Sequence, residues 1–145
     1  MICNNTFRIY GKSMKQQIIF HNGLKSNDGR GFEIAVVVVY NDRAKKDLEF
    51  SEIKDYKENV KKIYNNNPGA VEIFKIDIDP TQKTQILEVN SLDNVLECFI
   101  FAYFQNLNSA INSRIMLGKE FQKDKIFIEC DQAGISIKKQ KDILE

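Results

Sequence analysis

Histidine is nearly absent from this sequence, which holds one, His21, in 145 residues. That scarcity excludes a catalytic metal centre built from several imidazoles, since such centres commonly take three protein ligands. Cysteine is sparse too, because Cys3, Cys98 and Cys130 are widely spaced and form no C-x-x-C pair. This pattern argues against a disulfide framework and against a zinc ribbon. Free thiols fit a reducing compartment.

The sequence also lacks a charge excess and a long apolar run. The formal net charge is +1 and the pI about 7.6, which offers no electrostatic attraction for nucleic acid or an anionic membrane. The longest apolar runs, such as 34–40, are far shorter than a bilayer span. No basic and apolar leader follows Met1, so no secretory signal is expected. These features predict a cytoplasmic protein with no nucleic-acid and no membrane partner.

What the sequence does contain is typical of one globular domain. Hydrophobic residues make up 43% and charged residues 28% of the chain, which favours a packed core over disorder. No linker rich in proline, serine or glycine divides it. We therefore expect a single domain over residues 1–145, with a solvated tail over 138–145, that folds without disulfides or metal.

Hydrophobic periodicity predicts a mixture of strands and helices. The run 32–40, with four valines, is typical of a strand buried on both faces. Helical spacing of apolar residues predicts helices over 51–64, capped by Ser51, and over 91–108, capped by Ser91. Helices on one face of an antiparallel sheet make this an α+β fold. The remaining extended segments are 6–10, 14–21, a hairpin of 74–78 with 85–89, and the pair 126–128 and 135–137 joined by a turn at 132–134.

Five short segments stand in a recognisable order along the chain: 18–21, 28–34, 48–54, 90–94 and 125–130. The first ends on His21, the second opens with Asp28-Gly29-Arg30, and the last contains Glu129. Their order resembles the tunnelling fold (T-fold) of the 6-pyruvoyltetrahydropterin synthase and 6-carboxytetrahydropterin synthase family, over residues 5–138. The resemblance implies an antiparallel four-stranded sheet with two helices on one face and an extra hairpin, assembling into an oligomeric barrel.

The same resemblance implies a zinc site that this chain has lost. The family holds zinc with three histidines, and His21 alone remains, because Asp28 and Arg30 occupy the other two positions. A guanidinium stays protonated and cannot coordinate a cation. Leu24 stands where the family has its acid/base cysteine. We therefore expect no zinc and no other cofactor, with a different metal on His21 and Asp28 as the alternative.

The resemblance further assigns Glu129, Arg30, Asp28 and His21 to a ligand-binding set, with no catalytic residue identified. Glu129 would accept N–H bonds from a pterin-like or purine-like ring, and Asp28 would pair with Arg30 in the former metal cavity. Simpler interpretations stand beside these. His21 is structural or merely exposed, Asp28-Gly29 is a hairpin turn signal, and Glu129 is the outward-facing residue of an alternating strand.

The leading functional hypothesis is a pseudoenzyme of this family that binds a pterin-like or purine-like ligand, or a partner, without the parent chemistry. One alternative is an active synthase of the pterin or 7-deazapurine (queuosine) pathway, of carbon–oxygen or carbon–carbon lyase type, with an altered site. Another is a structural T-fold subunit of a larger complex, so enzymatic activity stays open. A homo-oligomer, trimer or hexamer, is expected because the apolar strand 34–39 would otherwise leave an unpaired edge.

Overall fold

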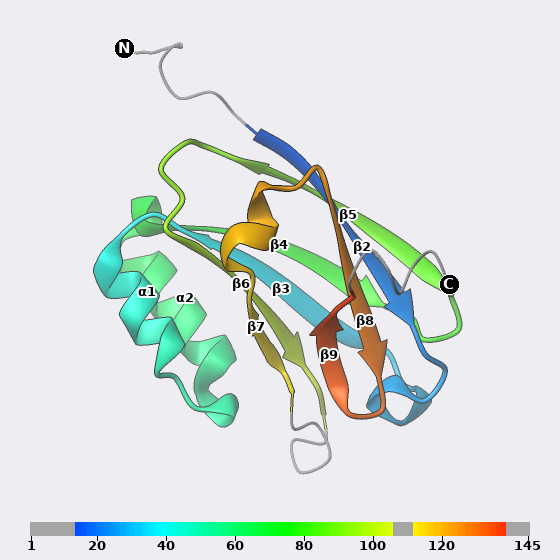
Figure 1. Ribbon diagram of the computed structural model, residues 1–145. Helices are drawn as coiled ribbons and strands as arrows, with labels where there is room; N and C mark the ends of the chain where they lie inside the picture. The colour runs from blue at the N-terminus through cyan, green and yellow to red at the C-terminus, as the bar shows by residue number, and fades with distance from the viewer. Residues whose placement is uncertain (1–13, 106–111, 139–145) are drawn as a thin grey trace.

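The computed structural model describes residues 14–105 and 112–138. Their strands form two four-stranded sheets, with strand orders β5-β2-β8-β9 and β4-β3-β6-β7, packed face to face as a sandwich (Figure 1). Every ladder is antiparallel except the one between β2 and β8. The strands are β2 (Met14–Asn22), β3 (Phe32–Val39), β4 (Val71–Ile78), β5 (Thr84–Ser91), β6 (Glu97–Tyr103), β7 (Arg114–Met116), β8 (Lys125–Asp131) and β9 (Gly134–Ile137).

The valine-rich strand β3 is buried on both of its faces, as its sequence predicted. Successive side chains of a strand point to opposite sides. Ile34, Val36 and Val38 join the core between the two sheets, whereas Val37 and Val39 join a second core beneath the helices. Each of the residues 34–39 is fully excluded from solvent. The second core explains why the strand carries no polar side chain over this stretch.

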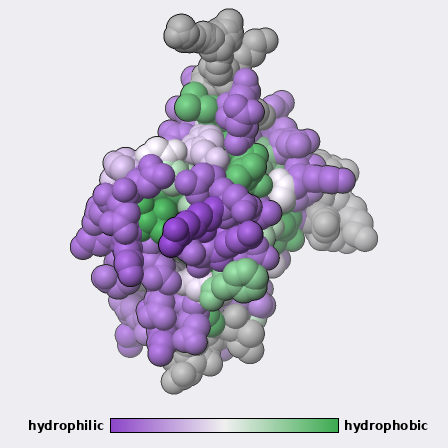
Figure 2. All heavy atoms as spheres, turned by 90° about the vertical axis from the view of Figure 1, so that its left-hand side faces the viewer, coloured by the Kyte–Doolittle hydropathy of each residue, from purple (hydrophilic) through white to green (hydrophobic). Residues whose placement is uncertain are grey.

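Two helices, α1 (Asp42–Glu49) and α2 (Tyr56–Asn66), cover the outer face of the β4-β3-β6-β7 sheet (Figure 1). The side chain of Asn41 caps α1 by accepting a hydrogen bond from the N–H of Ala44 at 2.8 Å. Helix α2 buries Tyr56 and Val60, which confirms the main part of the helix predicted over 51–64, but its N-cap is Asp55 and not the predicted Ser51. Figure 2 shows the exterior of this helical layer as mostly hydrophilic, with small and separate hydrophobic patches.

The helix predicted over 91–108 is wrong, because residues 97–103 form the strand β6. Phe99 and Phe101 pack under the helices, while the residues between and beside them enter the sandwich core. A strand buried on both faces has no polar residue to mark its period of two, so its apolar residues also matched a helical spacing. Asn90 and Ser91, expected to begin that helix, instead end β5.

The hairpin predicted near 70–89 is also wrong in its pairing. Its two strands exist as β4 and β5, but β4 pairs with β3 and β5 pairs with β2, so the turn between them crosses from one sheet to the other. Asp79 shapes that turn, since its carboxylate accepts hydrogen bonds from the N–H and the hydroxyl of Thr81, at 2.9 and 2.7 Å. The predicted final pair of strands is confirmed as β8 and β9.

A β-sandwich therefore replaces the predicted α+β T-fold. The edge expected at 34–39 does not exist, because β3 is an inner strand between β4 and β6, and the reason given for an oligomeric barrel disappears with it. Of the helices in residues 14–105 and 112–138, none is long and apolar enough to span a bilayer. The strand predicted over 6–10 and most of the tail predicted over 138–145 lie outside the described residues.

One lateral side of the sandwich, where β7 meets β9, is joined by backbone hydrogen bonds. The N–H of Ile135 donates to the carbonyl oxygen of Asn112 at 2.8 Å, and the N–H of Asn112 donates to Ala133 at 3.2 Å. Gly134 makes this approach feasible, because its φ is +127° and an added Cβ would lie 2.0 Å from the Asn112 oxygen. We call this the closed side, and the side formed by β4 and β5 the open side.

Candidate functional site

Two of the four residues predicted to bind a ligand, His21 and Glu129, lie side by side as partners in the parallel ladder of β2 and β8. Phe20 and Ile128 point into the core, so alternation places His21 and Glu129 on the outer face of their sheet. The imidazole of His21 stacks on the ring of Phe127, with centroids 5.8 Å apart and planes 22° apart. The fold thus brings together two predicted residues from opposite ends of the chain.

The surroundings of His21 favour its neutral form. Burial lowers its pKa below the ordinary value, the charge of Lys138 lowers it further, and the Glu129 carboxylate opposes both effects. The Nε2 atom is shielded from solvent and has no hydrogen-bond partner among the described residues. A neutral ring stacked on Phe127 contributes packing to this face rather than charge.

The other two predicted residues, Asp28 and Arg30, are exposed on the loop between β2 and β3. The positive φ predicted for an Asp-Gly turn is present, at +56° for Asp28 and +78° for Gly29. The loop is not a hairpin, however, because β2 and β3 belong to different sheets. The structure also contains no ion pair between Asp28 and Arg30, both of which it describes.

Neither a metal site nor an activated thiol is formed in the part of the chain that the structure describes. No group of three or more histidine, cysteine, aspartate or glutamate side chains could hold a metal ion there. Burial raises the pKa of Cys98 well above its usual range, and burial with the nearby Asp131 and Glu129 raises that of Cys130 to about 12. Both thiols therefore stay protonated and serve as packing groups.

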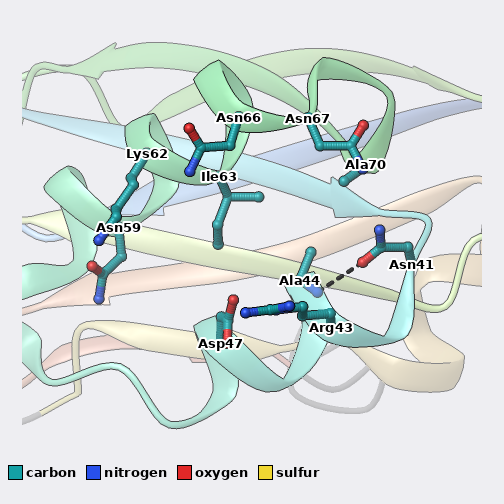
Figure 3. Close-up of a pocket in the computed structure, with 10 residues that line it drawn as sticks. All are labelled: Asn41, Arg43, Ala44, Asp47, Asn59, Lys62, Ile63, Asn66, Asn67 and Ala70. Carbon is teal, nitrogen blue, oxygen red and sulfur yellow. Dashed lines mark hydrogen bonds between the residues drawn. The ribbon is translucent and has the colours of Figure 1, made fainter.

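Among the grooves on the described part of the surface, three are lined by side chains from more than one element. The first, of about 610 Å³, lies between α1 and α2 and is polar, as Figure 3 shows. Arg43 and Asp47 enter it from α1, and Lys62 enters it from α2. Its apolar floor is small, and four asparagines complete the wall: Asn41, Asn59, Asn66 and Asn67.

The second groove, of about 870 Å³, runs between α2 and the edge strand β4. It combines basic and aromatic side chains. Helix α2 contributes Lys57, Lys61 and Tyr64, and Tyr64 is 45% exposed. The strand contributes a continuous stretch, Val71–Lys75, so side chains from both faces of β4 reach the groove.

The third groove, of about 400 Å³, lies beside the loop between β5 and β6. Leu92 and Leu96 on this loop are each about half exposed. Both ends of the loop are anchored, because the N–H of Leu92 donates to the hydroxyl oxygen of Tyr40 at 3.1 Å and the N–H of Leu96 donates to the carbonyl oxygen of Val39 at 2.8 Å. A fixed loop with exposed leucines is suited to contact with another protein.

None of these three grooves is lined by His21, Asp28, Arg30 or Glu129. No cluster of metal-ligating side chains lies in residues 14–105 and 112–138, and the two cysteines described there are buried. The side chains that line the grooves are apolar, charged or amide-bearing.

Comparison with solved structures identifies the architecture. No family model and no curated protein sequence matches the chain. The sandwich is similar to Lip of Serratia marcescens, a membrane-bound component of the type VI secretion system, with a TM-score of 0.69 and 16% identity over 87% of this chain and 96% of Lip. This is the TssJ-like β-sandwich fold. Identity this low establishes the fold alone.

Two further structures share this fold. The type VI secretion lipoprotein TssJ1 of Pseudomonas aeruginosa aligns with a TM-score of 0.59 and 12% identity, over 88% of this chain and 98% of TssJ1. A chain of a type VI membrane complex aligns with a TM-score of 0.64 and 10% identity, over 86% of this chain and 98% of the other. The similarity therefore covers most of this chain and nearly all of each other chain, and is not limited to one sheet.

These findings correct the family assignment. The chain is not a degenerate member of the pterin synthase family, because its structural neighbours are TssJ-like sandwiches and not T-folds. The pterin-like or purine-like ligand, the queuosine pathway and the active-synthase alternative all followed from the T-fold and are wrong with it. The selection of His21, Asp28, Arg30 and Glu129 as ligand-binding residues remains an untested prediction.

The expected location and partners are corrected as well. The prediction of a cytoplasmic homo-oligomer without a membrane partner is wrong, because the proteins that share this fold include a membrane-bound secretion component and a lipoprotein. The underlying reasoning treated a short apolar run and balanced charge as evidence about location. Neither property reports on which compartment or complex a β-sandwich occupies.

Sequence reasoning missed the groove beside β4. The sequence did contain a signal for it, since the segment Val71–Ile78 has apolar side chains on both faces, interrupted by charged ones. Such a mixture is typical of an edge strand, whose charged residues discourage uncontrolled pairing. Lys57, Lys61 and Tyr64 recur at helical spacing on one side of α2. Only the sheet order, however, reveals that this helix face and that strand edge adjoin.

Proposed function

We propose that this chain, as a single sandwich domain, is a TssJ-like subunit of the membrane complex of a type VI secretion system. The observation that carries the proposal is the end-to-end similarity to a membrane-bound component of that system, which covers 87% of this chain and 96% of the other. In this role the protein acts by binding other subunits and not by catalysis.

Two properties of the described surface support a binding role. The grooves are lined by a mixture of apolar, basic, acidic and amide side chains. The exposed Leu92 and Leu96 lie on a loop whose two ends are anchored by hydrogen bonds to Tyr40 and Val39. Pre-arranged contact residues reduce the ordering cost of association, which favours a stable subunit interface.

The experiment is affinity purification from the source organism. A tagged chain, produced from its own locus, is crosslinked in cells, solubilised from membranes with mild detergent and analysed by mass spectrometry. We expect the chain in the membrane fraction together with subunits of a secretion membrane complex, and we expect deletion of the gene to stop export by that system. The same tag on a cytosolic enzyme serves as the control.

Recovery of the whole chain from the soluble fraction, with none of those subunits and with export intact after deletion, would overturn the proposal.

A further inference from the structure

The edge strand β4 directs unpaired backbone groups away from its sheet. The N–H of Tyr40 donates to the carbonyl oxygen of Ala70 at 2.9 Å, which sets the alternation of the ladder with β3. Even-numbered residues of β4 therefore bond to β3, and the N–H and C=O groups of Ile73 and Lys75 point to the open side. No strand among the described residues pairs with this edge.

The groove beside this edge is positively charged. Lys57 already lies 3.6 Å from Glu33 and 5.4 Å from the ring of Tyr103. Lys61 and Lys75 form no ion pair within residues 14–105 and 112–138. The one acidic residue in the lining, Glu72, accepts a hydrogen bond from the hydroxyl of Tyr40.

Side chains on the other face of β4 are apolar apart from Glu72. Phe74 and Ile76 pack against the edge of the sandwich core and remain partly exposed. An added strand would place alternate side chains on these two faces. One set would meet Lys61 and Lys75 beside α2, and the other would cover Phe74 and Ile76.

We propose that the open edge of β4 binds an extended segment of a partner protein in which acidic and apolar residues alternate. The segment adds as a further strand, so its backbone bonds to Ile73 and Lys75, and its acidic side chains face Lys61 and Lys75. Addition of a strand to an exposed edge is an established mode of peptide recognition, in which backbone bonds give affinity and alternate side chains give specificity.

The charge of the groove argues against a second copy of this chain as the occupant. A second β4 on the same edge would bring its own Lys75 toward a lining that already holds three lysines. Like charges at an interface disfavour association, whereas opposite charges accelerate it and set the register. The proposal depends only on β4 and α2, so its test is independent of the proposed role in secretion.

The test uses a synthetic probe and the full chain. The probe is a fluorescein-labelled octapeptide of alternating glutamate and valine with blocked ends, and its binding is followed by fluorescence anisotropy in low salt. We expect a dissociation constant of roughly 10–100 μM, weakened about tenfold at high salt because exposed charges are screened. The matched lysine–valine octapeptide should bind at least about tenfold more weakly.

Two variants locate the site on the protein. Lys61→Glu combined with Lys75→Glu should weaken binding about tenfold or more, because both contacts become repulsive. Lys62→Glu is the matched control, since Lys62 is on the same helix but lines the other groove, and it should leave binding unchanged. Circular dichroism establishes that all variants are folded.

A probe methylated on the amide nitrogens of alternate residues tests the backbone bonds without changing the protein. Methylation of the set that faces β4 should abolish binding, and methylation of the opposite set should not. Equal binding of both methylated probes, equal binding of the two octapeptides, or an unchanged affinity in the double variant would each overturn the proposal.

Discussion

The closed and the open sides of the sandwich end their sheets in opposite ways. On the closed side, Asn112 exchanges backbone hydrogen bonds with Ala133 and Ile135, so β7 and β9 hold one another across the gap between sheets. On the open side, β4 and β5 are joined by one turn and otherwise leave their outer edges without a strand partner among the described residues. Satisfied backbone groups stabilise a fold, and unsatisfied ones are available for recognition.

The comparison separates the side that we expect to stabilise the sandwich from the side that we propose to bind a partner. The closed side depends on a glycine that no other residue can replace without a clash. The open side carries the larger groove, three lysines and the exposed Tyr64. Substitutions on the closed side should therefore change folding, and substitutions on the open side should change binding.

The largest effect is expected from Gly134→Ala. Its Cβ would lie 2.0 Å from the oxygen of Asn112, and its φ of +127° is unfavourable for alanine, so we expect a loss of about 3–5 kcal/mol in the free energy of unfolding. Gly69→Ala, at the start of the open side, places its Cβ 3.7 Å from Asn67 and should cost less than about 0.5 kcal/mol. Denaturant unfolding measures both, and equal losses would remove the distinction between the sides.

Hydrogen exchange should separate the two sides at the level of single amides. The N–H of Ile135 is bonded to Asn112, whereas the N–H of Ile73 points to the open side. We expect the Ile135 amide to exchange at least about 100-fold more slowly than the Ile73 amide, after correction for intrinsic rates. Similar protection at both positions would mean that the edge of β4 is already covered.

A smaller effect is expected from Arg114, which connects the closed side to the helical layer. Its guanidinium Nη1 donates to the carbonyl oxygens of Leu48, Glu49 and Ser51, at 3.1, 2.6 and 3.2 Å, where α1 ends. Arg114→Ala should destabilise the fold by about 1.5–3 kcal/mol, since hydrogen bonds from a charged donor are lost.

The matched change on the open side is Lys57→Ala, which removes an ion pair at 3.6 Å between the exposed ammonium of Lys57 and the partly buried carboxylate of Glu33. It should cost less than about 1 kcal/mol. Thermal unfolding compares the two variants, and a greater loss for Lys57→Ala would contradict the assignment of stability to the closed side.

The smallest effect concerns His21, whose NMR titration is unambiguous because the sequence contains no other histidine. Its pKa should lie below the model-peptide value of about 6.5, mainly because of burial. Lys138→Ala should raise this pKa and Glu129→Gln should lower it. A wild-type pKa above 6.5 would contradict the environment described for the ring.

The lowered pKa of His21 also predicts a small loss of folding stability in acid. As the pH falls below about 6.5, the unfolded chain takes up a proton on His21 before the folded chain does. The contribution of this residue is therefore present above that pH and declines until the folded-state pKa is passed. Unfolding midpoints of the wild type and of His21→Gln between pH 7.5 and 5 should converge as the pH falls.

Part of the fold could be predicted from local sequence. The strand β3, the helix α2 and the β8–β9 pair were recognised because their periodicity is clear and their turns carry the residues that such turns need. The strand β6 was not, because Glu97–Tyr103 is apolar on both faces and fitted a helical spacing equally well. The aromatic Phe99 and Phe101 were the available signal for a strand.

The candidate site was harder to predict than the fold. His21 and Glu129 do meet, but the pairing depends on a parallel ladder between distant strands that no local pattern reveals. The helix α1 was missed because it buries only Ala44 and Leu48. The resemblance to a pterin synthase rested on the order of short segments along the chain. That order does not determine which strands pair in the fold.

Photocrosslinking in the source organism tests the central claim most directly. A benzophenone amino acid is placed at Lys75 on the open side or at Gln132 on the closed side, and crosslinked products are identified by mass spectrometry. We predict a crosslink from position 75 to a subunit of the secretion membrane complex and none from position 132. Crosslinks to that complex from position 132 alone, or none to it from either position, would contradict the account.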